Sequence, residues 1–364
     1  MPTRRVFAAS VLGFVSCALI GAGAQQPVFR TETNYIEVVA SVTNKAGGFV
    51  RGLTAADFEI REQGRRESID SFSFVELPTG VPAAGVPPVL FRPGMPAEQR
   101  EADGRLYLIY LNGATAANTP WVRRLATNFV TDNLLPGDRA AIWDAQFPFR
   151  PVRFTNDRTT LLADIEPYTG ASLEGEMPFA FRCSQSTVAS LDSGPRELCR
   201  SALEQPYREL AKAIQWFNGI QGRRKSIILF AGGWLGPTDP VTRSDITLYA
   251  VDVRGLAGLD AGILNSSGQT GAAAATGVGE RMSQLNASVD GLWALANRTG
   301  GFAIINHNNF RPGFARIVEA NSQYYVLGYA SSYTRRDRVY RELDVKVKRP
   351  GVKVLARRGY FPLQ

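Results

Sequence analysis

Side chains that commonly carry catalysis are scarce in this sequence of 364 residues, which has one histidine and three cysteines. His307 lies in the segment FAIINHNNF. A Ser-His or Cys-His hydrolase would need it beside a nucleophile and an orienting acid. The sequence indicates no such arrangement, so we expect His307 to be a polar residue at a strand end. A zinc site would draw on several His or Cys ligands, and too few are present.

The N-terminus predicts export. Two arginines, Arg4 and Arg5, precede an uncharged apolar run that ends in Ala22-Gly23-Ala24, a small-residue cleavage signal. We therefore expect residues 1–24 to be a signal peptide, cleaved before Gln25, and the protein to be periplasmic or extracellular. A retained membrane helix is one alternative, and a lipoprotein anchored at Cys17 is another. No later segment is long and apolar enough to span a bilayer.

Export also sets the expected state of the remaining two cysteines. Cys183 and Cys199 form an even pair in a chain predicted to reach an oxidising compartment, which favours a disulfide between them. Two buried free thiols are the alternative.

Glycine-rich and basic segments could bind ligands. The segment AGGWLG follows an apolar run, but it matches neither the P-loop nor the dinucleotide fingerprint, so we expect a tight turn. Basic residues cluster at 222–225, 334–338, 346–349 and 356–358, and the formal net charge is +8. In strands, such residues typically form a solvated face that protects an edge from pairing. Contact with anionic envelope material is the alternative, and export argues against a nucleic-acid partner.

The chain divides into segments with different periodicity. Alternating apolar and polar residues predict an antiparallel β region over residues 25–76, with Gln63-Gly64 at a hairpin turn. Residues 77–104 form a Pro/Gly-rich linker. Strands alternate with helices over residues 105–321, which predicts a doubly wound, mostly parallel α/β sheet. Residues 322–364 return to antiparallel β, and we expect them to pack beside the N-terminal β region.

Two features of the α/β segment bear on ligand binding. The Gly/Ala-rich stretch 255–279 is too long for an ordinary connection, so we expect it to be either disordered or a contact or gating loop. Trp121, Trp216 and Trp293 fall inside predicted helices, where we expect them in the core.

Several phrases together resemble the von Willebrand factor A-related domain proteins that are abundant in Acidobacteria. They include VVASVTNKAGGFVRGLTAADFEIREQG, LLPGDRAAI, FTNDRTTLLADI, RRKSIILFAGG, ITLYAVDVRG, LANRTGGFA and the C-terminal QYYVLGYASS and YRELDVKVKRPGVKVLARRGYF. The resemblance covers most of the chain after residue 24. It implies a von Willebrand A-like sheet with a metal-ion-dependent adhesion site, built from loops at the carboxyl edge.

The sequence departs from this family at the metal ligands. The first loop, which should carry an Asp, reads Asn112-Gly-Ala-Thr115-Ala-Ala-Asn118, and the loop after KSIILFA reads Gly232-Gly233-Trp234 without an Asp. Amide and hydroxyl oxygens alone compete poorly with the water around Mg²⁺. We therefore expect no cofactor and no bound Mg²⁺ or Mn²⁺. Only Asp144 and Asp252 lie close enough by strand position to restore a ligand.

These residues lead to an interpretation as an exported, non-catalytic binding module with a degenerate metal site. Its expected partner is a protein or an anionic polymer of the cell envelope. Trp234 either anchors that partner or plugs the vacated metal site. A secreted hydrolase using Asp144, Asp252 or His307 is one alternative, and a structural component of an envelope assembly is another. The expected binding residues are Asn112, Thr115, Asn118, Gly232, Gly233 and Trp234.

Overall fold

The computed structural model describes residues 34–77, 104–112, 118–148, 150–170, 193–220, 224–234, 238, 244–255, 272–333 and 339–362. The predicted signal peptide, nearly all of the predicted linker, Thr115, Cys183 and the side chain of Cys199 lie outside this part of the chain, so the predicted disulfide stays a prediction. Most of the stretch 255–279 lies outside it as well. Among the described helices, none combines the length and apolar character needed to cross a bilayer.

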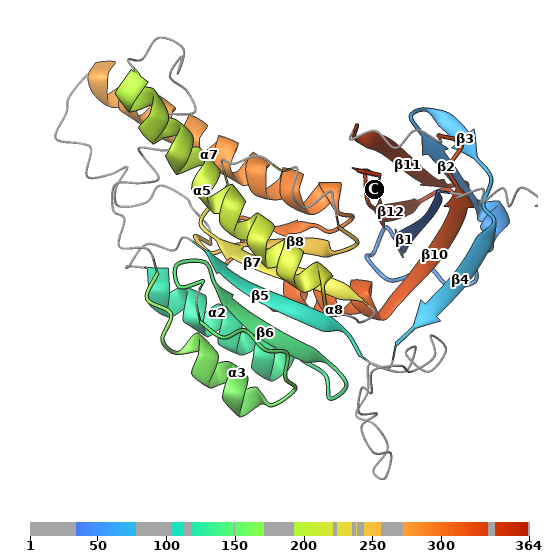
Figure 1. Cartoon of the computed structure of the whole chain (residues 1–364), viewed down its shortest axis with the longest axis horizontal. Coiled ribbons are helices and arrows are strands. Elements are labelled where there is room, and N and C mark those ends of the chain that lie inside the picture. Colours follow the sequence, from blue (N-terminus) through green and yellow to red (C-terminus); the bar gives the residue numbers. More distant parts are fainter. Residues whose placement is uncertain are drawn as a thin grey trace, which may run out of the picture. The chain divides into compact units, whose positions relative to one another are not determined.

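Five parallel strands form a central sheet in the order β6-β5-β7-β8-β9 (Figure 1). The three inner strands are continuous apolar runs buried on both faces. The chain moves outward from β5 to β6 on one side and from β7 to β8 and β9 on the other. The sheet therefore has a topological switch point between β5 and β7. The strands are β5 (Leu106–Asn112), β6 (Arg139–Asp144), β7 (Lys225–Ala231), β8 (Thr247–Asp252) and β9 (Ala303–Ile304).

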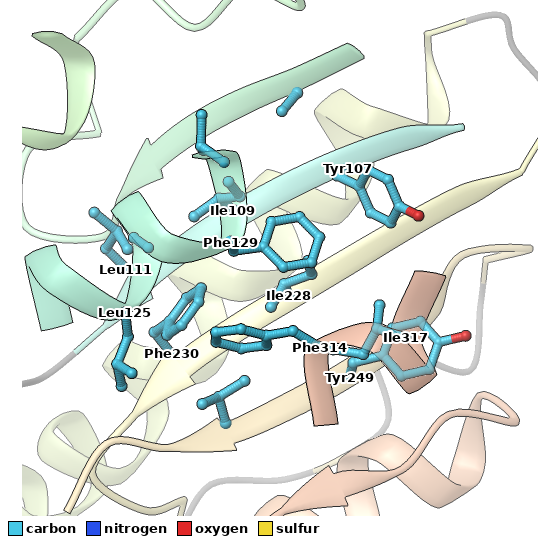
Figure 2. Close-up of a cluster of buried hydrophobic side chains, with 14 of the residues drawn as sticks. Tyr107, Ile109, Leu111, Leu125, Phe129, Ile228, Phe230, Tyr249, Phe314 and Ile317 are labelled. Atoms are coloured by element: carbon cyan, nitrogen blue, oxygen red, sulfur yellow. The ribbon is translucent and has the colours of Figure 1, made fainter. Parts of the chain in front are cut away.

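Helices cover both faces of this sheet, as the alternation of strands and helices predicted. Side chains of β5 alternate between the two faces. Tyr107, Ile109 and Leu111 pack toward α2, α3 and α8, in the cluster around Phe129 and Phe314 that Figure 2 shows. The even-numbered residues of β5 pack toward α5 and α7. The helices are α2 (Thr119–Asp132), α3 (Arg158–Ile165), α5 (Ser193–Asn218), α7 (Ala272–Arg298) and α8 (Arg311–Ser322).

Strands from the two ends of the chain build two antiparallel sheets, ordered β12-β1-β10-β4 and β13-β11-β2-β3. The pairing of β1 with β10 and β12, and of β2 with β11, confirms that the N- and C-terminal β regions pack beside each other. One shared core joins the two sheets. The elements are β1 (Tyr35–Asn44), the 3-10 helix η1 (Ala55–Asp57), β2 (Phe58–Glu62), β3 (Arg65–Glu67), β4 (Ser71–Glu76), β10 (Gln323–Ala330), β11 (Arg341–Val347), β12 (Val352–Ala356) and β13 (Gly359–Tyr360).

The predicted turn between β2 and β3 is present. Gln63 and Gly64 have φ values of 49° and 79°. Positive φ at both central residues matches the twist of a two-residue hairpin, and Gly accepts this conformation without a steric cost. The turn sets the register in which Glu62 lies opposite Arg65.

A buried ion pair fixes the start of β5. The Nε of Arg105 donates to Oδ1 of Asp138 at 2.7 Å, and Nη1 of Arg105 donates to the hydroxyl of Ser322 at the end of α8. The second carboxylate oxygen of Asp138 accepts the backbone N–H of Leu135 at 2.9 Å. This network places the turn before β6 and the end of α8 against the same strand.

Candidate binding site at the carboxyl edge

The carboxyl ends of β5 and β7 lie side by side. Asn112, the last residue of β5, lies opposite Ala231, the last residue of β7. Gly232 and Gly233 follow directly, and Gly233 has a φ of 128°, which favours glycine. Open parallel sheets bind ligands outside the carboxyl ends of their strands at such a switch point. The structure thus brings Asn112, Gly232 and Gly233 together, while Thr115 lies outside the described residues.

Asn118 lies at the start of α2, which follows the loop after β5. It occupies the N-cap position in a helical conformation, with φ of −92° and ψ of −7°, and its side chain makes no capping hydrogen bond. A typical N-cap Asn is extended and caps the helix with its side-chain oxygen. The half-buried amide of Asn118 is thus not used to cap α2.

Trp234 supports the loop after β7 from inside the molecule. Only 2% of the residue is exposed, and it belongs to the core on the α5 and α7 side of the sheet. Its backbone N–H donates to the carbonyl oxygen of Ser288 at 2.9 Å. A Cβ atom added at Gly291 of α7 would lie 1.9 Å from the carbonyl oxygen of Trp234. This burial favours the alternative in which Trp234 fills the vacated metal site over the one in which it is exposed and anchors a partner.

Asp252, at the end of β8, is held by an arginine that the sequence interpretation did not single out. Arg254 donates from Nε to Oδ1 at 2.8 Å and from Nη2 to Oδ2 at 2.7 Å, a bidentate pair. Its Nη1 donates to the hydroxyl of Ser288 at 2.9 Å. The guanidinium therefore neutralises the carboxylate from within the chain. The sequence signal was an arginine two residues after the Asp, in AVDVRG.

Asp144, at the end of β6, is buried in a different environment. Its Oδ1 accepts the backbone N–H of Gln146 at 3.0 Å, and Nη1 of Arg150 lies 3.7 Å from Oδ2. Burial raises the pKa of this carboxyl above its usual value, and the hydrogen bond from Gln146 and the charge of Arg150 oppose that shift. Among the described residues, Oδ2 has no hydrogen-bond partner.

Asp144 and Asp252 do not share a site. Strands β5 and β7 lie between β6 and β8, so the two strand ends are three strand spacings apart, roughly 14 Å. A pair of carboxylates acting on one bond, or ligating one ion, would need to converge. The two predicted replacements for the missing metal ligands therefore cannot act together.

His307 follows β9 and is exposed. A Cβ atom added at Gly255 would lie 3.5 Å from the carbonyl oxygen of His307 and 2.5 Å from Oδ1 of Asn308, so the residues after β8 and β9 touch. In the described part of the chain, no hydrogen bond joins the His307 ring to an acid or a hydroxyl. His307 thus lies at the carboxyl edge, and the residues that the structure describes do not give it the neighbours that a hydrolase needs.

The donor set fits a divalent cation poorly. Within the described ranges, no group of three or more His, Cys, Asp or Glu side chains is placed to hold a metal ion. Asn112 offers a neutral oxygen, and the carboxylate of Asp252 already accepts two hydrogen bonds from a guanidinium. Mg²⁺ gives up its water reluctantly and favours carboxylates.

Comparison with known proteins does not assign the chain to a group: no protein-family model matches it, and no curated protein matches it.

Proposed function

We propose that this protein is a non-catalytic von Willebrand A-related binding module, exported to the cell envelope. Its partner is a protein or an anionic polymer of the envelope. Binding occurs at the carboxyl edge of the parallel sheet, through Asn112, Asn118 and the backbone of Gly232 and Gly233, and requires no metal ion. Trp234 holds the shape of this edge from below.

The bidentate pair between Arg254 and Asp252 carries the proposal. In a metal-dependent adhesion site, the cation neutralises the carboxylates and accepts the partner's acid. Here a guanidinium neutralises the carboxylate that ends β8, and its three hydrogen bonds fix it in place. The edge therefore carries no free acid from β8 that would repel an anionic partner. A switch point between β5 and β7 supports the location.

The hydrolase hypothesis has less support because its candidate catalytic residues lie far from one another. Asp144 and Asp252 end strands that are not neighbours, and Asp252 is held by Arg254. His307 has no orienting acid among the described residues. A general base needs hydrogen-bond reach to the proton that it removes, and an oriented His needs an acceptor.

The test is binding of the purified full chain to cell-envelope fragments, measured by sedimentation with and without EDTA. We expect the same affinity in both buffers. Asn118→Glu puts a negative charge at the proposed site, which would repel an anionic partner, and should weaken binding about tenfold, equivalent to ~1.4 kcal/mol. Asn156→Glu is the matched control, because Asn156 is an exposed asparagine that follows the segment bridged to β6. It should bind like the unchanged protein.

Melting experiments with Mg²⁺, Mn²⁺ or Ca²⁺ provide an independent check. A ligand at 100 times its Kd stabilises the native state by about 2.7 kcal/mol, which moves the melting temperature by a few degrees. We expect no shift. A saturable shift with Mg²⁺ or Mn²⁺, or binding that EDTA abolishes, would contradict the metal-independent mechanism. A hydrolytic activity lost in His307→Ala would overturn the binding module itself.

A further inference from the structure

A cleft of about 560 Å³ lies at the opposite, amino edge of the parallel sheet. We call it the amino-edge cleft. Its size is within the range of small-molecule sites. The first residues of β7 and β8 and the end of α7 form one wall, and the sheet containing β1, β4 and β10 forms the other. Its lining includes Arg224, Lys225, Arg298 and Arg357, with Val39 and Val326 opposite.

Strand alternation makes the second wall partly apolar. In β1, Val38 and Ala40 are buried in the core between the two antiparallel sheets, so Val39 points to the other face and into the cleft. In β10, Tyr325 and Leu327 face that core, while Val326 lines the cleft. Val75 of β4 lines it too. These side chains can cover an apolar body but cannot satisfy a charge.

Arg224 supplies a buried positive charge in this cleft. It is 6% exposed, its Nε donates to Oδ1 of Asn321 at 2.9 Å, and its guanidinium lies 5.0 Å from the ring centre of Tyr324. Asn321, Tyr324 and the nearby Tyr249 are neutral side chains, and in the described part of the chain no ion pair joins Arg224 to a carboxylate. Burying a charge is costly unless an opposite charge accompanies it. An anionic ligand would supply that charge.

The remaining charges of the cleft leave an excess of positive charge. Lys225 pairs with Asp245 at 3.4 Å. Glu76 pairs at 2.7 Å with Arg51, which does not line the cleft. Glu37 is then the acid that faces Arg224 and Arg298, while Arg357 has partners of its own, such as the carbonyl oxygen of Gly359 at 3.1 Å. Burial lowers the pKa of Arg357, and the charge of Asp245 opposes that shift. Near a protein surface, where the effective dielectric constant is below that of water, such an excess of positive charge attracts an anion.

We propose that the amino-edge cleft binds a small organic anion, with its carboxylate or phosphate group on Arg224 and Arg298 and an apolar body against Val39, Val75 and Val326. Arginine suits this role because its planar guanidinium donates two parallel hydrogen bonds to a carboxylate or a phosphate. The site is separate from the carboxyl-edge site, because it lies at the other end of the same strands.

Calorimetric titration of the full chain with four probes tests the proposal. Phenyl phosphate and benzoate carry both parts of the expected ligand and distinguish phosphate from carboxylate. Inorganic phosphate carries the charge alone, and benzyl alcohol carries the ring alone. We expect at least one of the first two to bind saturably, about tenfold more tightly than either partial probe.

Charge-removing variants locate the binding. Arg224→Gln and Arg298→Gln should each weaken it about tenfold. Arg311→Gln, which removes an 82% exposed arginine outside the lining, should leave it unchanged. Arg298→Gln keeps the test decisive if Arg224→Gln fails to fold. Among the described residues, the Arg298 side chain makes no ion pair or hydrogen bond, and its guanidinium lies 5.7 Å from the ring centre of Tyr340. Absence of saturable binding by all probes, or binding that survives both variants, would overturn the proposal.

Discussion

Arg254 converts the end of β8 from an acidic position into a neutral one. The carboxylate of Asp252 is fully buried and accepts two hydrogen bonds from the guanidinium. The hydroxyl of Ser288 ties the same guanidinium to α7. These three residues, from β8, the turn after it and α7, thus act as one unit, and removing one member affects the others.

We expect Arg254→Ala to lower the free energy of unfolding by about 3 to 5 kcal/mol, because it leaves a buried carboxylate without its counter-charge. Urea denaturation monitored by tryptophan fluorescence measures this. The double variant Arg254→Ala, Asp252→Asn removes both charges and should recover a large part of the loss. An equal loss in the single and double variants would show that packing, rather than charge, explains the effect.

Asp144 should lower the stability of the protein as the pH rises, whereas an acid held in an ion pair raises it. Its folded-state pKa is raised by burial, so ionisation costs stability above that pKa, and the cost disappears as the pH falls below the ordinary value of 3.8. Asp144→Asn removes the ionisation and keeps an oxygen for the N–H of Gln146. We expect the variant to gain stability over the unchanged protein at pH 7.

The control for Asp144→Asn is pH itself, with chemical denaturation of both proteins at pH 7 and near pH 3.5. The advantage of Asp144→Asn in the free energy of unfolding should shrink as the pH falls from 7 to 3.5. A difference that stays constant over this range would contradict the burial of an ionised Asp144.

The sequence was enough to place Asp144 and Asp252 at the carboxyl edge. It was not enough to predict which side chains surround them. Asp144 and Asp252 could be placed because each ends a recognisable apolar strand. The pairing of Asp252 with Arg254 depends on the conformation of the turn after β8, which the spacing of apolar residues does not predict. The burial of Trp234 depends on α7 passing close to the loop, which a residue type cannot reveal.

At the scale of elements, α7 lies against the loop after β7 at a distance that admits only glycine. A Cβ atom at Gly291 would come 1.9 Å from the carbonyl oxygen of Trp234. The helix and the loop are therefore in backbone contact, and the shape of the carboxyl edge depends on this residue.

We expect Gly291→Ala to destabilise the protein by about 1 to 3 kcal/mol through overpacking, although Ala is favoured over Gly inside a helix by about 1 kcal/mol. Thermal unfolding measures the change. Ala287→Gly, at an exposed position of the same helix, is the control and should cost only the helix propensity. A rise in melting temperature for Gly291→Ala would mean that the loop adapts without cost.

Strands and turns could be predicted where the sequence carries a clear apolar run or turn signal. The burial of individual side chains on a helix could not be predicted in this way. The parallel strands follow from their apolar runs, and the β2–β3 hairpin follows from Gln63-Gly64. Trp293 was expected in the core, and this was wrong because it is 56% exposed. Its neighbours Leu292 and Leu295 pack on the sheet instead. Helical period alone does not decide which of two adjacent apolar residues faces inward.

At the scale of the whole molecule, the antiparallel sheets depend on strands more than 240 residues apart, since Glu37 lies opposite Gly328. The alternation of apolar and polar residues predicted antiparallel strands at both ends of the chain, and we expected them to pack together. The register could not be derived, because an alternating strand matches several partners equally well.

Removing residues 322–364 should therefore unfold more than the deleted strands. It takes away β10 and β12, the partners of β1 on both sides, and β11, a partner of β2. We expect the shortened chain to aggregate, because unpaired strand edges and exposed apolar faces associate. Gel filtration and circular dichroism measure this. Adding the missing segment as a separate polypeptide should restore a folded complex, whereas a monomeric, cooperatively folded fragment would contradict the dependence.

The direct passage from α8 into β10 has a mechanical consequence. Ser322 ends the helix and Gln323 begins the strand, so no flexible residue separates them. Strand β10 lies inside its sheet, bonded to β1 on one side and β4 on the other. A pull on α8 along the direction of β10 would load both rows of hydrogen bonds in shear, so that many bonds share the force. Force applied to the parallel sheet would then pass through α8 into the two antiparallel sheets. Because β10 is a central strand, this force would not peel a strand from the edge of its sheet.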